Sequence, residues 1–301
     1  MRRAALILLV LGLAALAMPA HAYRLIQNTA TGRVTAGNLV TCSDAGGFTH
    51  WNTRAIAWRH NTALQGAGAA AALQSSMAAW TNVPDADHVL TYAGTTAAGW
   101  ATDGQNTILW ANGNGCTGNC LALTALVLQA GQVIVETDIT FNNNFTWNTN
   151  GNDQDVQAVA THELGHSLGI HHTELNPSTK PTMFATYFGT GGRTLETDDR
   201  SALQCSEWRY CVSRKLKGDG GGYFAGRQIG TLYWNGCLVG ANVDIFKDGV
   251  KILTTPNDGV QGTMVVAPQG TANYWVCDAG STTWYNSATC TNVITLNHFA
   301  P

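Results

Sequence analysis

The chain has 301 residues, of which 45% are hydrophobic and only 12% are charged, about half the charged share of an average globular protein. The large hydrophobic share excludes a disordered chain, and 16 Lys and Arg residues against 19 Asp and Glu argue against a nucleic-acid-binding protein. At this length we expect two domains.

The first 22 residues are predicted to form a signal peptide. Arg2 and Arg3 precede an apolar run from Ala4 to Ala17, and Ala20-His21-Ala22 supplies the small residues that signal peptidase requires. The alternative is a membrane anchor, but this run is shorter than the roughly 20 apolar residues that span a bilayer. We therefore expect a secreted protein, extracellular or periplasmic in transit, with no membrane span in the mature chain.

The front part of the mature chain is predicted to contain several strands and a helix. Leu73, Met77 and Trp80 share one face at helical spacing, which indicates a helix packed on a core and stopped by Pro84. The predicted strands are Ala55–Trp58, Val89–Tyr92, Thr107–Trp110, Leu121–Leu128 and Val133–Phe141. In the last of these, the hydrophobic residues, Val135 among them, face one side, and Glu136 and Asp138 face the other.

A polar segment and a long helix follow. Asn142 to Asp155 is rich in Asn, Gly and Asp, which predicts a surface loop, and Asn152-Asp153 is a suitable N-cap for a helix that runs to about Ile170. Another helix is expected to begin near Asp198-Asp199. Strands and a few helices in this order predict an α+β domain.

The predicted long helix carries the residues that indicate chemistry. His162 and His166 are four residues apart, so both imidazoles project from one helix face and can bind one metal ion. Glu163 follows the first histidine, and its side chain is long enough to reach a water molecule on that metal.

A glycine and a further histidine complete the pattern HExxHxxGxxH. Gly169 can adopt the positive φ of a sharp turn that returns the chain toward the metal, and the spacing then selects His172 rather than His171 as third ligand. Three imidazoles and an open position predict a catalytic zinc site, with no need for the two-histidine, one-carboxylate set of iron oxygenases. The remaining histidines without ligand spacing are His50, His60, His88 and His298.

This segment resembles the active site of the metzincin metalloendopeptidases, and specifically of their matrixin branch. Pro181-Thr182-Met183-Phe184 stands where that family has a methionine-containing turn, so Met183 is the candidate Met-turn residue. Glu136-Thr137-Asp138-Ile139-Thr140-Phe141 is similar to the matrixin strand before the active-site helix, and Leu195-Glu196-Thr197-Asp198-Asp199 is similar to the start of the last helix. The resemblance covers about residues 40–215 and implies a metzincin-type zincin domain over 23–217, with a twisted sheet and an active-site helix.

Two features depart from related families. Astacins and serralysins carry a zinc-binding tyrosine two residues after the methionine, whereas this chain has Ala185 there and Tyr187 is out of register. The segment around Cys42 also does not match the matrixin latency motif. We expect Cys42 to form a disulfide; the alternative is a thiol that blocks zinc.

The resemblance implies a zinc-dependent endopeptidase. Zinc activates a water molecule, Glu163 acts as general base, and a peptide bond of a protein substrate is hydrolysed. The substrate is expected to lie extended along Leu121-Ala122-Leu123-Thr124-Ala125, unless this is an internal strand. Matrixins usually also bind structural Ca²⁺, for which Asn142–Asp155 and Asp198-Asp199 offer oxygen ligands; a solvated loop and a helix cap are the alternatives. We expect a monomer.

Residues 223–301 show only strand signals and follow a Gly-rich segment at residues 218–222. The expected strands are Gln228–Trp234, Val243–Lys247, Gly262–Val266, Ala272–Cys277 and Thr291–Leu296, with a hairpin turn at Lys247-Asp248-Gly249. This spacing predicts a small all-β sandwich domain. Its order resembles a fibronectin type III-like domain, which implies a role in binding or stability.

The eight cysteines of an exported chain are expected to form disulfides. Close spacing suggests three pairs: Cys116–Cys120, Cys205–Cys211 and Cys277–Cys290. Five cysteines precede the Gly-rich segment and three follow it, so complete oxidation requires at least one disulfide between the two domains.

Two other functions are compatible with parts of the sequence. One is a secreted adhesin or binding protein with a vestigial zinc site, which the intact Glu163 disfavours. The other is a zinc hydrolase that acts on a substrate other than protein, which Met183 disfavours.

Overall fold

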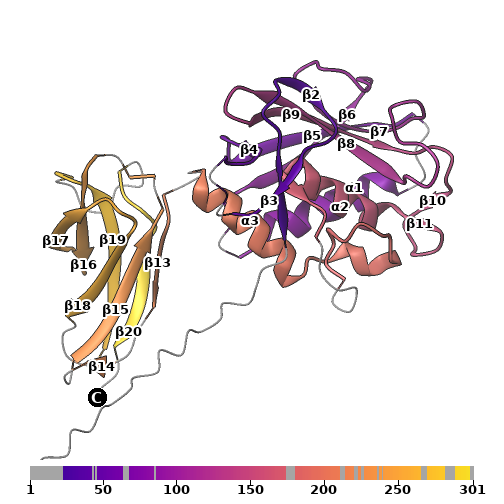
Figure 1. The fold of residues 1–301 in the computed structure, drawn as a ribbon. Helices are drawn as coiled ribbons and strands as arrows, with labels where there is room; N and C mark the ends of the chain where they lie inside the picture. Colours follow the sequence, from indigo (N-terminus) through magenta and orange to yellow (C-terminus); the bar gives the residue numbers. More distant parts are fainter. Residues whose placement is uncertain are drawn as a thin grey trace, which may run out of the picture.

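The computed structural model describes residues 23–298 except 43, 45, 64–67, 85, 174–179, 211–213, 220–222, 225–226, 236, 239, 266–269 and 282–288. The predicted signal peptide lies outside these residues. Within the described part, no helix is long and apolar enough to span a membrane. The chain first forms a unit of sheet and helices, called here the first unit, and then an all-strand second unit (Figure 1).

The first unit is built on a seven-stranded mixed sheet in the order β2-β8-β9-β7-β5-β6, with β4 also paired to β9. Every strand predicted for this part is present. The sheet strands are β2 Gly32–Val34, β4 His50–Trp51, β5 Ala55–Asn61, β6 Val89–Thr96, β7 Asn106–Trp110, β8 Ala122–Gln129 and β9 Val133–Phe141. The remaining elements are β1 Arg24–Gln27, β3 Asn38–Val40, α1 Ala69–Thr81, β10 Trp147–Asn148, β11 Gln154–Asp155, α2 Val156–Ser167, β12 Ile170–His171, the 3₁₀ helix η1 Gly189–Arg193 and α3 Thr197–Arg209.

Helices α1 and α2 lie together beneath this sheet (Figure 1). The predicted face of α1 is the buried one, since Leu73, Met77 and Trp80 are at most 2% exposed. Trp80 also donates its indole N–H to the carbonyl of Thr161, 2.8 Å away in α2. The hydrophobic face of α1 therefore packs against α2, the predicted long helix.

Strand β9 differs from the simple two-face prediction. Glu136 and Asp138 do lie opposite the hydrophobic face, but both are buried, and Val135 of the hydrophobic set is 40% exposed. Arg33 of β2 compensates the buried charge, because its guanidinium lies 2.7 Å from Asp138 Oδ2 and 3.6 Å from Glu136 Oε1. The polar face of β9 is thus an internal ion-pair site beneath the N-terminal segment.

Both ends of α2 differ from the prediction. The N-cap is Asp155 rather than Asn152-Asp153, and its carboxylate accepts the N–H of Ala158 at 2.9 Å and pairs with Arg193. The helix ends at Ser167 rather than near Ile170, because Gly169 has φ +83° and redirects the chain into β12. Arg193, from a later part of the chain, pairs with the carboxylate of Asp155 and so stabilises this residue as the cap.

The second unit consists of two four-stranded sheets, β13-β15-β14 with β18 on β15, and β17-β16-β19-β20. Leu232 and Trp234 of the first sheet and Val243, Ile245 and Tyr274 of the second belong to one buried cluster. The strands are β13 Leu216–Asp219, β14 Tyr223–Phe224, β15 Arg227–Trp234, β16 Asn242–Lys247, β17 Val250–Pro256, β18 Val260–Val265, β19 Gly270–Asp278 and β20 Ile294–His298.

Some local features of the second unit differ from the prediction. The hairpin turn is present, with Asp248 and Gly249 at φ +47° and +87°. However, β13 includes Gly218 and Asp219 of the predicted Gly-rich break and pairs with β15, and the last strand begins at Ile294 rather than Thr291. Cross-strand pairing thus extends order into a segment whose glycines alone suggested a linker. The likeness to fibronectin type III remains a prediction.

Two of the three suggested cysteine pairs are present. Cys116–Cys120 and Cys277–Cys290 are disulfides, but Cys205 pairs with Cys42 rather than with its near neighbour Cys211. Cys42 is therefore not a free thiol. Cys237 is also disulfide-bonded. The expected disulfide between the units depends on Cys211, which lies outside the described residues.

Candidate active site

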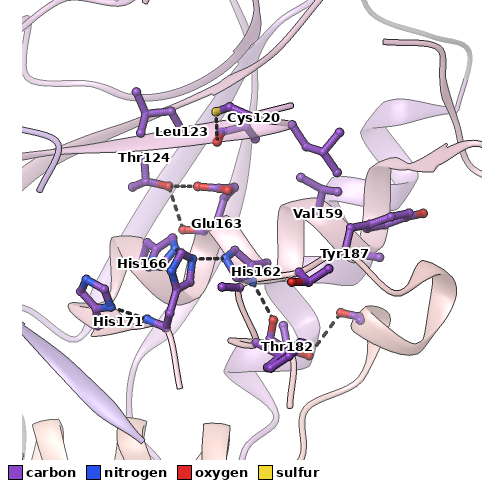
Figure 2. Close-up of a pocket in the computed structure, with 18 of the residues that line it drawn as sticks. Cys120, Leu123, Thr124, Val159, His162, Glu163, His166, His171, Thr182 and Tyr187 are labelled. Atoms are coloured by element: carbon purple, nitrogen blue, oxygen red, sulfur yellow. Dashed lines mark hydrogen bonds between the residues drawn. The ribbon is translucent and has the colours of Figure 1, made fainter. Parts of the chain in front are cut away.

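Three histidines converge at the end of α2. His162 and His166 extend from the helix, and His172 reaches them from the chain after β12 (Figure 2 shows the first two). Nε2 of His172 lies 3.1 Å from Nε2 of His162 and 3.2 Å from Nε2 of His166. Within the described part of the chain, they form the one group of three or more His, Cys, Asp or Glu residues arranged to hold a metal ion.

Backbone carbonyls orient two of the rings. Nδ1 of His162 is 2.6 Å from the carbonyl oxygen of Thr182, and Nδ1 of His166 is 2.8 Å from that of Ile170. Because a carbonyl can only accept, both Nδ1 atoms carry the proton, and each Nε2 presents a lone pair to the common centre. His171 lines the same cavity but is not part of this group, and its Nδ1 accepts the N–H of His172.

The electrostatics keep these rings neutral. Burial, and then the neighbouring histidines, lower the pKa of His162, His166 and His172 to about 3. Three neutral imidazoles, two of which have Nδ1 held by a backbone carbonyl, match the ligand set of a catalytic zinc site. The residues at this position therefore fit zinc.

Glu163 lies beside the three histidines and lines the same cavity. Its side chain is buried, and this burial raises the pKa of its carboxyl to about 7, although a hydrogen bond from Thr124 opposes the shift. The hydroxyl of Thr124 lies 2.6 Å from Oε2 of Glu163 (Figure 2). A carboxyl group with a pKa near neutrality can both accept and release a proton at physiological pH.

Met183 lies under the site, close to the helix that carries the histidines. A Cβ built on Gly165 would be 2.3 Å from the sulfur of Met183, so only glycine permits this approach. Asp199 of α3 holds the same turn, because its carboxylate accepts the N–H groups of Thr182 at 2.9 Å and Met183 at 3.0 Å. Asp199 thereby also places the carbonyl of Thr182 that orients His162.

Gly169 makes the turn that brings His172 back. Its φ of +83° is one that side chains rarely adopt, and a Cβ at this position would be 2.2 Å from the carbonyl oxygen of Thr49. The sequence pattern predicted the positive φ, whereas the close approach of Thr49 depends on the tertiary fold.

A cavity of about 690 Å³ opens in front of the histidines. Leu121–Thr124 form one wall, and Phe184–Gly189 form the opposite side. Strand β8 pairs with β9 along its length, but on its other edge β2 covers only Leu126–Leu128. Among the described strands, none pairs with this outer edge at Ala122–Ala125. Four of the five residues predicted to bind substrate, Leu121 to Thr124, therefore line the cavity, and Ala125 is buried behind it.

The sequence singled out Thr124 and Asp199 for other roles, but not the contacts through which they build the site. Thr124 and Asp199 act through contacts that are 39 and 16 or more residues apart in the chain, which no local motif encodes. Tyr187 lines the cavity, but its hydroxyl bonds the backbone of Asp155 and Asp153. It thus supports the start of α2, in agreement with its position out of register for a metal-binding tyrosine.

The segments considered for calcium use many of their oxygens internally. Asn142, Asn148 and Asn150 accept backbone N–H groups within their own loop. Asp199 bonds the methionine turn and, with Glu196, forms the capping box of α3. Both alternatives to calcium, a loop and a helix cap, are thus seen, and a calcium site remains a prediction.

Comparison with known proteins agrees with this geometry. A stretch of 68 residues is 37% identical to interstitial collagenase of Equus caballus, and the match covers 22% of this chain and 14% of the collagenase. The chain therefore corresponds to a small part of that relative. The model of the matrixin family matches residues 50–206, slightly more than half of this chain and including all three histidines and Met183. The chain belongs to the matrixin family of zinc metalloendopeptidases.

Proposed function

We propose that this protein is a secreted endopeptidase that hydrolyses peptide bonds of protein substrates, with zinc held by His162, His166 and His172. The observation that carries the proposal is the convergence of three Nε2 atoms beside a buried carboxyl group at the wall of an open cavity. A structural zinc site has four protein ligands and no use for such a carboxyl group.

The chain's own residues account for the proton transfers. When bound, zinc supplies a Lewis acid that polarises a carbonyl and lowers the pKa of water toward about 7. Glu163 takes a proton from the attacking water and delivers it to the amine of the leaving group. Its pKa, raised to about 7 by burial, suits both transfers.

We assign substrate binding to the outer edge of β8. No described strand pairs with the outer edge of Ala122–Ala125, so the backbone groups that point away from β9 can pair with an extended peptide, which gives affinity that does not depend on side-chain identity. Strand β2 ends this edge at Leu126, so only a short stretch of peptide can pair here. The cavity beyond is lined by apolar and aromatic residues such as Val159, Phe184 and Phe188.

The remaining features of the proposal concern the whole chain. Residues 1–22 direct secretion, the first unit forms the protease domain, and the second unit, which begins with β13 rather than at residue 223, forms a fibronectin type III-like domain that contributes binding or stability. The protein acts as a monomer.

The experiment compares wild type with Glu163→Gln, which keeps the shape of the side chain and removes the base. Both proteins are purified, their zinc content is measured, and cleavage of an unfolded protein is followed. We expect equal zinc content, cleavage by wild type, and a loss of at least 1,000-fold in the variant, the upper range for one positioned proton-transfer group. Equal activity of the two proteins would exclude Glu163 as the base. Zinc binding without cleavage by wild type would favour a binding protein.

A further inference from the structure

Among the described residues, only Thr124 donates a side-chain hydrogen bond to the carboxylate of Glu163. Its Oγ1 is 2.6 Å from Oε2 of Glu163 and 3.1 Å from the backbone carbonyl of the same residue. Both side chains are buried, with exposed fractions of 7% and 5%. The hydroxyl proton points to the nearer acceptor, the carboxylate oxygen.

This contact constrains the carboxylate in a specific way. A glutamate side chain has three rotatable bonds, and its terminal torsion is soft. A donor at Oε2 removes that freedom and leaves Oε1 available toward the cavity that Glu163 lines. Threonine is suited to this task, because its branched Cβ restricts χ1 and so aims the hydroxyl.

The position of Thr124 connects two parts of the proposed mechanism. It lies in β8, within the segment whose outer edge is open to a peptide, and its side chain crosses to the helix that carries the histidines. The strand that receives the substrate backbone is therefore bonded directly to the base. A shift of β8 relative to α2 would move the carboxylate with it.

We infer that Thr124 is a positioning residue: its hydroxyl holds one oxygen of Glu163 and fixes the other toward the reacting water. This inference rests on the proposed function. The loss of a supporting hydrogen bond of this kind typically costs about 10- to 100-fold. The loss is expected in kcat, because the geometry of proton transfer changes while the backbone of β8 still binds the substrate.

The test uses Thr124→Val, which has nearly the same shape without the hydroxyl, and Thr124→Ser, which retains the hydroxyl. Melting temperature and zinc content of each variant are measured first, and then kcat and KM on one peptide. We expect kcat of the Val variant to fall about 10- to 100-fold with KM within about 2-fold, and the Ser variant to regain most of the loss.

A double variant separates positioning from general packing. If Thr124 acts through Glu163, adding Thr124→Val to Glu163→Gln causes no further loss of the residual activity. A rise in KM alone, an equal loss in both backgrounds, or an unchanged kcat would overturn the inference while wild-type cleavage still supports the proposed function. Absence of cleavage by wild type would overturn both.

Discussion

At the scale of single residues, hydrogen bonds to the backbone place the side chains of the site. His162 and His166 are aimed by the carbonyls of Thr182 and Ile170, and neither carbonyl belongs to α2. Asp199 then supports one of these carbonyls from a third element, α3. The metal-binding geometry therefore depends on residues that never contact the metal.

This dependence predicts the effect of Asp199→Ala. The variant leaves the N–H groups of Thr182 and Met183 without their acceptor, so the carbonyl that orients His162 shifts. We expect zinc affinity to fall about 10- to 100-fold, measured by competition with a chromophoric chelator. Asp198→Ala is the matched control, because this neighbour accepts the N–H of Tyr23 instead. Equal zinc affinity of both variants would contradict the prediction.

Asp138 gives a prediction about pH. Burial raises the pKa of its carboxyl to about 6 even though Arg33 pairs with it. A folded-state pKa above the usual value of 3.8 means that this group contributes most to stability below pH 4 and loses that contribution as pH rises through 6. Asp138→Asn should remove this part of the pH dependence. Urea unfolding at several values between pH 4 and 7 measures it, and parallel curves for the two proteins would argue against the assignment.

At the scale of elements, the edge of β8 and the end of α2 define the site together. β8 is covered at Leu126–Leu128 by β2 and open at Ala122–Ala125, so the N-terminal segment determines how much of the edge a peptide can use. At the other side of the cavity, α2 ends at Ser167 and the turn at Gly169 leads into β12. The antiparallel pairing of β12 with β1 then holds the segment that precedes His172.

The turn at Gly169 is expected to tolerate no side chain. In Gly169→Ala, the positive φ costs about 1 kcal/mol, and the new Cβ also collides with the carbonyl of Thr49, so His172 is displaced. We expect a lower melting temperature together with weaker zinc binding. Gly131→Ala is the control, since Gly131 has φ +81° but open space around it. Similar zinc affinities in both variants would show that the clash is relieved without moving His172.

At the scale of the whole molecule, the two ends of the first unit are tied together. The Cys42–Cys205 disulfide joins the N-terminal segment to α3 across 163 residues. Lys215, which begins the second unit, lies 2.9 Å from Glu207 and 3.0 Å from Asp87 of the first. Covalent and ionic links thus supplement a core in a chain with few charged residues.

The two disulfides of the first unit should differ in their contribution to stability. Loop-closure entropy predicts about 5 kcal/mol for the 163-residue separation of Cys42 and Cys205, and about 2 kcal/mol for the four-residue separation of Cys116 and Cys120. Replacing each pair by serine and measuring the free energy of unfolding in urea tests this order. A larger loss for the Cys116 and Cys120 pair would show that packing around the bonds outweighs chain entropy.

The sequence by itself determined the elements and the chemical groups. Hydrophobic periodicity located α1 and five of the seven strands of the main sheet, but not the short strands β2 and β4. The spacing of His162, His166 and His172 around Gly169 indicated one metal centre. These features are local, because helix and strand geometry convert a spacing of a few residues directly into a direction in space.

The tertiary structure alone decided which distant groups meet. The pairing of Cys42 with Cys205, the burial of Asp138 against Arg33, the cap at Asp155 and the bond from Thr124 to Glu163 all join residues from separate elements. Short-range patterns contain no information on such contacts, since they depend on how the sheet, α2 and the N-terminal segment pack together. The sequence of α2 and of the turn after it therefore identifies the three histidine ligands. The orientation of Glu163 and of the histidine rings depends on contacts with other elements.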